Sequence, residues 1–260
     1  MFGVHFYHQR MRKSVALFGR MFNDLYILRK NSTGATISQV KVPLAYAPKQ
    51  KFLERIRSFP NLETDQSVAV KLPRMSFEIL GISYDTARQL PKINNYINNG
   101  TTINTRNRIY SYVPYNLSFQ LNIFTKNQDD ALQIVEQILP RFNPTYTLTV
   151  KPLSSIPDIK EDVPITIAGV TFTDDFEGPM EQRRTIIYTI DFEMKANFYG
   201  PIAEAGIVRT SINNFFQIGS GMLDSDELLE TLTVKPNPLT VSPDSDFGFS
   251  ETLTQSVDSA

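Results

Sequence analysis

The sequence predicts an α+β fold, with a mixed, mostly antiparallel sheet, helices packed on one face of that sheet and an extended C-terminal arm. Three patterns indicate this fold: a strand–helix–strand unit over residues 114–150, a second regularly alternating segment over 186–197, and an acidic, Ser/Thr-rich tail. Strands with one polar face are typical of antiparallel or mixed sheets whose other face is covered by helices. We therefore expect a single α+β domain over residues 1–205 and an extended acidic arm over residues 206–260.

The segment 114–150 is the most regular part of the chain. In its first half, apolar and polar residues alternate, which is the period of a β-strand. The apolar positions are Tyr115, Leu117, Phe119, Leu121 and Ile123. Its second half changes to helical spacing, with apolar positions at Leu132, Ile134, Val135, Ile138 and Leu139. We expect Asp129 to cap this helix, Asp130 to lie in its first turn and Pro140 to end it. Residues 145–150 are predicted as the second strand.

The remaining elements follow from the same periodicities. Helices are predicted over 9–23 and 49–59, a hairpin over 24–30 and 35–45, strands over 68–70, 75–84 and 165–172, a loop over 152–163 and a turn over 174–179. Residues 85–108 are too polar to pack and too long for a plain connection, which favours a projecting loop or arm that reaches a partner; a disordered loop is the alternative. The arm beyond residue 206 cannot bury enough surface to repay its ordering entropy, so we expect it to be disordered or ordered only against a partner.

Length and composition exclude several classes of protein. The 260 residues are enough for a sizeable core, with 41% hydrophobic and 20% charged residues. No apolar run approaches the roughly 20 residues that a membrane helix needs, so no membrane partner is expected. The first residues lack the basic start and apolar centre of a signal peptide. Because the chain has no cysteine, disulfide frameworks and thiolate sites are excluded. A cytosolic location fits this composition.

The chain offers few groups for catalysis. Its two histidines, His5 and His8, have no partner carboxylate nearby in the sequence, which disfavours a metal site. Asp129 and Asp130 are explained by helix capping, and Asp224, Asp226 and Glu227 lack the register of a calcium loop. Asp174, Asp175 and Glu177 lie in a predicted turn, where acids are common; a cation site there is the less favoured alternative. Gly219-Ser220-Gly221 lacks the lysine of a phosphate loop. We therefore expect no catalytic, cofactor-binding or metal-binding residues, no cofactor, and a protein that is not an enzyme.

Charge is divided unequally along the chain. Residues 1–60 carry eleven Lys or Arg against two acids, and residues 204–260 carry two bases against nine acids. Such a division can bring unlike ends of neighbouring subunits together or direct each end to a different partner. Two solvated faces without a function are the alternative. A nucleic-acid-binding module in the basic N-terminal region is a competing interpretation. Its basic residues are spread around an apolar helix without the aromatic interleaving of a known module: Arg10, Arg12, Lys13 and Arg20.

Several short motifs, in a fixed order, carry a family resemblance. The specific one is the run Gln133-Ile134-Val135-Glu136-Gln137-Ile138-Leu139-Pro140. The shorter ones are Met1-Phe2-Gly3, Val42-Pro43, Tyr46-Ala47, Phe52, Leu72-Pro73-Arg74, Ile123-Phe124-Thr125-Lys126, Asp129-Asp130, Phe142, Pro144, Arg183-Arg184 and Arg209-Thr210. Together they resemble the tail completion and sheath-stabiliser proteins of contractile-tailed, T-even-type bacteriophages. The arm beyond about residue 215 lies outside this resemblance.

The resemblance implies a structural virion protein at the head-proximal end of the tail. Proteins of this family form a hexameric ring above the tail-tube terminator, hold the last ring of the tail sheath and offer a docking surface to the neck of the filled head. It implies assembly in the host cytoplasm and passage of DNA through the ring without specific binding. The family has no catalytic residues to carry over. We expect the arm over 206–260 to lie across a neighbouring subunit or the sheath.

Overall fold

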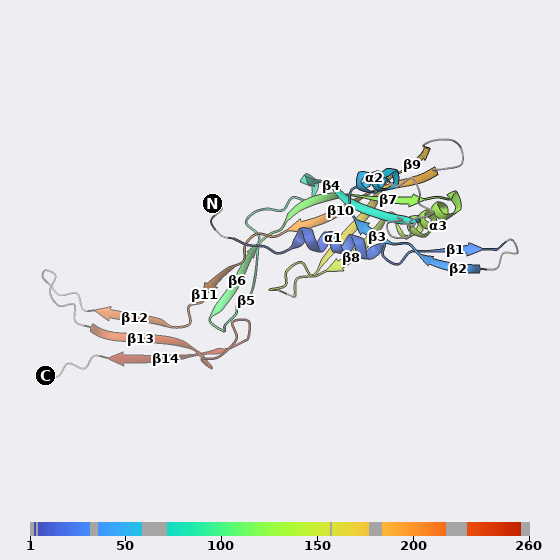
Figure 1. The fold of residues 1–260 in the computed structure, drawn as a ribbon. Coiled ribbons are helices and arrows are strands. Elements are labelled where there is room, and N and C mark those ends of the chain that lie inside the picture. Colours follow the sequence, from blue (N-terminus) through green and yellow to red (C-terminus); the bar gives the residue numbers. More distant parts are fainter. Residues whose placement is uncertain are drawn as a thin grey trace, which may run out of the picture. The chain divides into compact units, whose positions relative to one another are not determined.

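Two long strands, β7 (Val113–Thr125) and β10 (Arg184–Phe198), form the centre of a six-stranded sheet (Figure 1). The strand order is β3-β4-β7-β10-β9-β8. The other members are β3 (Leu44–Tyr46), β4 (Arg74–Tyr84), β8 (Thr145–Val150) and β9 (Glu161–Phe176). Only β3 and β4 pair in parallel, so the predicted mixed, mostly antiparallel sheet is confirmed.

The computed structural model describes residues 3, 5–31, 36–58, 72–156, 158–176, 184–216 and 228–255. The contacts between residues group the chain into two units. The central unit comprises Phe6–Gln89 and Tyr112–Phe198, and the terminal unit comprises Met1–His5, Leu90–Ser111 and Tyr199–Ala260. The boundary predicted at residues 205/206 stays a prediction of domain organisation, which separate expression of the two parts would test.

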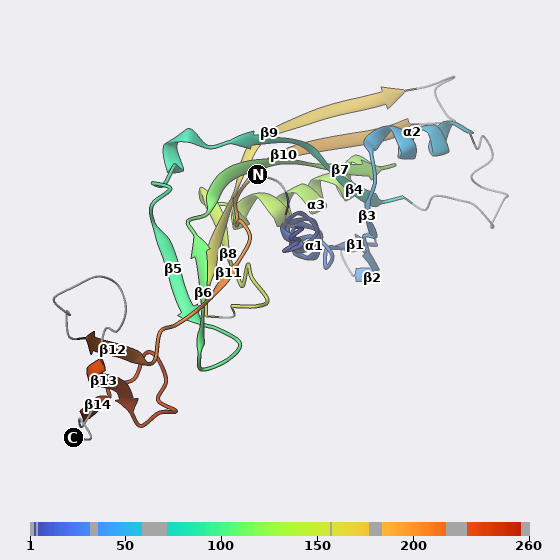
Figure 2. The same cartoon turned by 90° about the vertical axis from the view of Figure 1, so that its left-hand side faces the viewer.

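Helices α1 (Arg10–Met21) and α3 (Gln128–Ile138) cover one face of the six-stranded sheet (Figure 2). Phe18 of α1 stacks on Phe119 of β7, with ring centroids 4.4 Å apart. Alternating residues of β7 and β10 and the apolar face of α3 complete the core: Leu117, Leu121, Ile123, Ile134, Val135, Ile138, Ile190, Phe192 and Met194. The strand–helix–strand prediction for 114–150 and the amphipathic helix near residue 10 are confirmed.

Details of α3 differ from the prediction. Asn127 occupies the N-cap position, and Asp129 lies in the first turn, where its Oδ2 accepts a hydrogen bond of 2.7 Å from Gln133 Nε2. The expectation that Asp129 caps the helix was wrong, because the helix begins at Gln128. Leu132 and Leu139 are 43% and 39% exposed, and Ala131 lies on the buried face instead. Asp130 does lie in the first turn, and α3 ends before Pro140, as predicted.

The opposite face of the sheet is polar and carries helix α2 (Lys49–Ser58) at one end. Phe52 of α2 packs there with Phe124 and Ile187. Amide, hydroxyl and carboxylate groups bond to one another along the rest of this face, through the pairs Gln120–Asp191, Asn122–Gln120, Thr189–Asn122 and Lys49–Thr189. This is the polar face that the alternation in 114–125 predicts.

A two-stranded hairpin lies beside α3 and is formed by β1 (Tyr26–Lys30) and β2 (Thr36–Lys41). It confirms the predicted hairpin up to Lys41, whereas residues 44 and 45, predicted in its second strand, belong to β3 and pair with β4. The strand predicted over 68–70 lies outside the described residues, whereas α2 and β4 confirm the predictions over 49–59 and 75–84. Asp174 and Asp175, expected in a turn, belong to β9 because they pair with β10.

The segment 85–108 is more ordered than predicted. It contains a short 3₁₀ helix, η1 (Thr86–Arg88), and the antiparallel pair β5 (Asn95–Asn99) and β6 (Thr105–Tyr110), to which β11 (Ala203–Gly206) adds a third strand. Its strands are held mainly by backbone hydrogen bonds, which need few apolar side chains, so polarity did not prevent regular structure. That this segment is an arm that reaches a partner stays a prediction.

Three further strands form a sheet of their own, called here the C-terminal sheet: β12 (Ser211–Phe216), β13 (Leu228–Asn237) and β14 (Gly248–Gln255). Both pairs are antiparallel, and β13 is the middle strand. The described part of the predicted arm therefore has its own strand pairing within the chain. Among the helices of the described residues, none has the length and apolar character needed to cross a membrane.

Candidate interaction surfaces

The residues considered for chemistry do not gather into a site in the part of the chain that the structure describes. No group of three or more His, Cys, Asp or Glu side chains that could hold a metal ion occurs there. The His8 ring lies 5.5 Å from that of Phe6. The acidic group around Asp224 and the Gly219-Ser220-Gly221 segment lie outside the described residues, as does Glu177.

Arg10, the first of the basic residues on α1, is buried within the central unit. Its guanidinium donates to Glu161 Oε2 at 2.7 Å and to the carbonyl oxygen of Asn197 at 2.9 Å. The other oxygen of Glu161 accepts the backbone N–H of Asn197 at 3.1 Å. Burial raises the pKa of Glu161, and the positive charge of Arg10 opposes that change without cancelling it. Arg10 therefore joins α1 to the ends of β9 and β10 and is not available to a nucleic acid.

Lys13 is also engaged within the fold. Its Nζ donates to the carbonyl oxygen of Pro152 and to Ser154 Oγ, both at 3.2 Å. Arg12 and Arg20 remain exposed. Because two of the four basic residues on this helix serve the fold, the structure offers little support for an N-terminal nucleic-acid-binding module.

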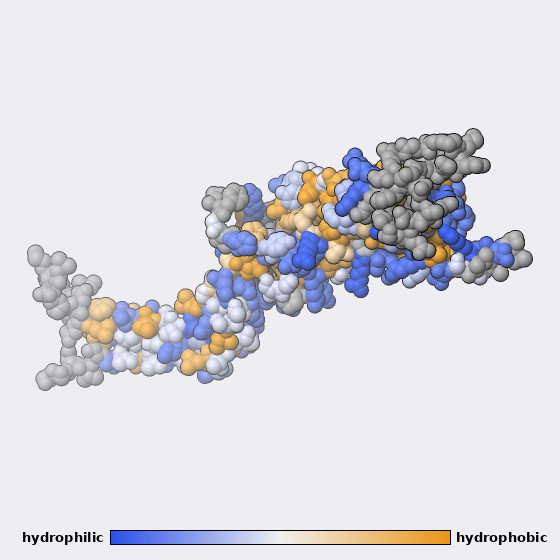
Figure 3. All heavy atoms as spheres, in the orientation of Figure 1, coloured by the Kyte–Doolittle hydropathy of each residue, from blue (hydrophilic) through white to orange (hydrophobic). Residues whose placement is uncertain are grey.

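The C-terminal sheet gathers several apolar side chains on one of its faces. The side of this sheet in view in Figure 3 is mainly polar, with scattered hydrophobic residues. The strand register places five apolar side chains on this face: Phe215, Leu232, Val234, Phe249 and Leu253. Polar side chains share this face: Ser211, Asn213, Glu230, Glu251 and Gln255. The opposite face carries mainly threonine, serine and asparagine side chains, with the exposed Ile212 among them. Phe249 is 70% exposed and Leu253 55% exposed. Exposed apolar side chains gathered on one sheet face in this way are typical of a surface that another protein covers.

Polar contacts order the connections of the terminal unit. Arg209 donates to the carbonyl oxygens of Leu239 at 3.0 Å and Val241 at 2.8 Å. The Thr105 hydroxyl donates to Glu204 at 2.6 Å, and this bond, with two from Thr101, lowers the pKa of Glu204. Patterns of hydrophobicity could not reveal these contacts, because they join isolated polar residues far apart in the sequence.

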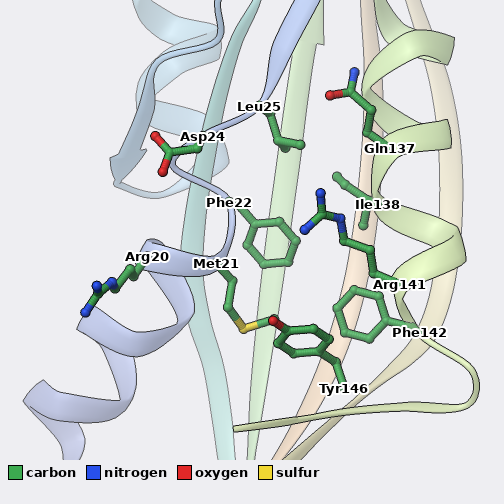
Figure 4. Close-up of a pocket in the computed structure, with 10 residues that line it drawn as sticks. All are labelled: Arg20, Met21, Phe22, Asp24, Leu25, Gln137, Ile138, Arg141, Phe142 and Tyr146. Carbon is green, nitrogen blue, oxygen red and sulfur yellow. The ribbon is translucent and has the colours of Figure 1, made fainter.

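A pocket of about 210 Å³ opens in the central unit between the end of α1 and the end of α3 (Figure 4). Its apolar lining includes the buried Phe22, Leu25 and Ile138 and the half-buried Met21, Phe142 and Tyr146. The guanidinium of Arg141 points into it. No local sequence pattern indicates this pocket, because its lining comes from four separate elements and the loop after α1.

Exposed apolar side chains on one face of a sheet are typical of the class of proteins that act through association with other proteins. A comparison with known protein families shows which family the chain belongs to. The chain matches the T4-like virus Myoviridae tail sheath stabiliser family over residues 5–259 and belongs to that family.

The chain is also similar to the tail completion protein gp15 of Enterobacteria phage T4, with 28% identity over 265 residues that cover 99% of this chain and 95% of the relative. The chain is thus a structural component of a contractile phage tail and is not an enzyme. The resemblance to T-even-type tail completion proteins is confirmed. The family match also includes the arm, which the resemblance in the sequence did not reach.

Proposed function

We propose that this sheath stabiliser acts as a hexameric ring at the head-proximal end of the tail. The ring caps the tail tube above its terminator protein, holds the last ring of sheath subunits and offers the neck of the filled head a docking surface. The observation that supports the proposal most directly is the exposed apolar face of the C-terminal sheet, in a chain that belongs to a sheath-stabiliser family.

A cyclic ring requires a heterologous interface, in which one surface of a subunit meets a different surface of the next. The charge division supplies two unlike surfaces, with a net charge of +9 over residues 1–60 and −7 over residues 204–260. Opposite charges steer such surfaces together and disfavour pairing of like ends. The ring assembles in the host cytoplasm, and DNA passes through its opening without specific binding.

The C-terminal sheet is the surface that we assign to protein partners. All residues of its outer strands β12 and β14 are exposed, and both strands have one unpaired edge among the described residues. Unpaired edges and exposed apolar faces are the features through which sheets bind other chains. The partners are the neighbouring subunit and the tail sheath protein.

Deletion of residues 211–260 tests this assignment. The cut removes the whole C-terminal sheet and leaves the core of the central unit intact, so we expect a folded protein that has lost ring formation, sheath attachment or both. Size-exclusion chromatography with light scattering measures the first, and sedimentation of the protein with assembled tails measures the second. A folded truncated protein with unchanged behaviour in both assays would contradict the assignment.

The competing nucleic-acid-binding function predicts a steep dependence of DNA affinity on salt concentration, because each phosphate contact releases counterions. Arg10 and Lys13 are committed to contacts within the fold. We therefore expect weak DNA binding, which fluorescence anisotropy over a range of salt concentrations would measure.

A further inference from the structure

The pocket in the central unit combines an apolar floor with an unpaired positive charge. The Arg141 guanidinium has no hydrogen-bond or ion-pair partner among the residues that the structure describes, and it points into the pocket (Figure 4). Arg20, at the last turn of α1, is likewise unpaired there. The acidic residue of the lining, Asp24, is already paired with Lys41 at 2.8 Å. The Arg20 guanidinium points away from the other lining side chains, so the positive charge that the pocket presents is that of Arg141 (Figure 4).

The size and chemistry of the pocket define its ligand. A volume of about 210 Å³ is below the roughly 300–1,000 Å³ of pockets for small molecules and cofactors. A single large apolar side chain, preferably aromatic, matches the floor of Phe22, Ile138 and Phe142. A guanidinium beside such a floor favours a carboxylate next to the inserted side chain. The ligand is thus a protein segment with an aromatic residue close to an acid.

Strand β14 carries such a segment. Phe249 has the greatest exposure of any aromatic side chain among the described residues, and Glu251 lies two positions further on, on the same face of the strand. Two residues along a strand span about 6.6 Å, so the ring and the carboxylate project side by side. β14 is also an outer strand, with one edge unpaired among the described residues.

We propose that Phe249 of one copy of this chain occupies the pocket of a second copy, with Glu251 forming an ion pair with Arg141. Charge favours this match, since Glu251 lies in the acidic terminal region and the pocket residues Arg20 and Phe22 lie in the basic N-terminal region. A second copy supplies the segment, because closure into the proposed ring requires two different surfaces of identical chains to meet. The proposal rests on the proposed ring and names a heterologous contact within it. The pocket provides an aromatic anchor of the kind that dominates many interfaces, and the surrounding surfaces contribute the remaining buried area.

Charge reversal tests the ion pair. We expect Arg141→Glu and Glu251→Arg each to weaken ring assembly about tenfold or more, and the double variant to recover most of that loss, because it restores opposite charges. Thr252→Arg is the matched control, since Thr252 neighbours Glu251 but lies on the opposite face of β14. Circular dichroism of each variant checks that it folds, and analytical ultracentrifugation measures assembly.

Disulfide cross-linking tests the contact itself. The chain has no natural cysteine, so Arg141→Cys and Glu251→Cys introduce single thiols without a background. We expect a cross-linked dimer when the two variants are mixed and oxidised, and markedly less cross-linking when Arg141→Cys is mixed with Thr252→Cys. This proposal would be overturned if rings formed normally, showed no selective cross-link and were unaffected by both charge reversals. That result would leave the proposed ring intact. A wild-type chain that remains monomeric at high concentration would overturn both.

Discussion

Phe18 is the most extensively stacked residue of the core. Its buried ring lies 4.4 Å from that of Phe119, 5.0 Å from Phe22, 5.3 Å from Phe192 and 5.4 Å from Phe77. The Phe18 ring therefore connects helix α1 to the three strands β4, β7 and β10. The residue therefore fixes the position of the helix on the sheet.

Replacement of Phe18 by alanine should lower the free energy of unfolding by about 3–5 kcal/mol, since a buried ring is lost and a cavity remains. Urea denaturation measures this change. The matched control is Phe172→Ala, because Phe172 is 50% exposed and contacts mainly Tyr188, so its loss should cost about 1 kcal/mol. Equal effects of the two substitutions would contradict the assignment of Phe18 to the core.

Glu161 makes stability depend on pH. Burial raises its pKa above the usual 4.5, so the folded state binds a proton more tightly than the unfolded state. The resulting stabilisation is fully present below the unfolded pKa and is lost as pH rises through the folded pKa. The free energy of unfolding of the wild type, minus that of Glu161→Gln, should therefore fall as pH rises from about 4. A difference that increases over this range would show that the Arg10 ion pair dominates over burial.

At the scale of elements, helix α3 explains the residues of the run 133–140, which carries the resemblance to the family. Ile134 and Val135 enter the core, whereas Gln133 and Gln137 bond to the backbone of the neighbouring hairpin. Gln133 accepts from the N–H of Leu28 and donates to its carbonyl oxygen, at 2.9 and 3.2 Å. These amides satisfy backbone groups of β1 and explain why glutamine, not a charged residue, suits these positions.

Helix α1 approaches strand β4 closely at Gly19. A Cβ atom on Gly19 would lie 2.9 Å from the ring of Phe77, which is itself held between Phe18 and Tyr46. Gly19→Leu should therefore destabilise the protein by about 1–3 kcal/mol through overpacking, measured by thermal or urea denaturation.

Gly81→Ala serves as the control for this substitution. No heavy atom lies within 4 Å of a Cβ built on Gly81, so we expect a change within about 0.5 kcal/mol. A stability of Gly19→Leu equal to that of the wild type would mean that α1 does not pack on β4 at this distance.

The elements that could be predicted from the sequence are those with a strong local period. The alternation in β7 and β10 and the helical spacing in α1 and α3 follow directly from burial on one side. The strands β5, β6 and β14 could not be predicted in this way, because they carry polar side chains on much of their surface and depend on backbone pairing. The pocket beside Arg141 depends on tertiary packing and has no local signature.

At the scale of the whole molecule, the chain combines a rigid core with surfaces for association. The six-stranded sheet with α1 and α3 provides the core, and the C-terminal sheet provides an apolar face that no described residue of its own sheet covers. The opposite net charges of the N-terminal and C-terminal regions favour head-to-tail association of identical copies. These features suit a sheath stabiliser, whose task is to join other proteins.

The central claim of the proposed function is that identical copies close into a ring. Negative-stain electron microscopy of the purified protein at high concentration, with mass measurement of the same sample by light scattering, tests this claim most directly. We predict six-fold rings with the mass of six chains of 29.6 kDa each. A homogeneous monomer under these conditions, with no ring in the images, would contradict the account.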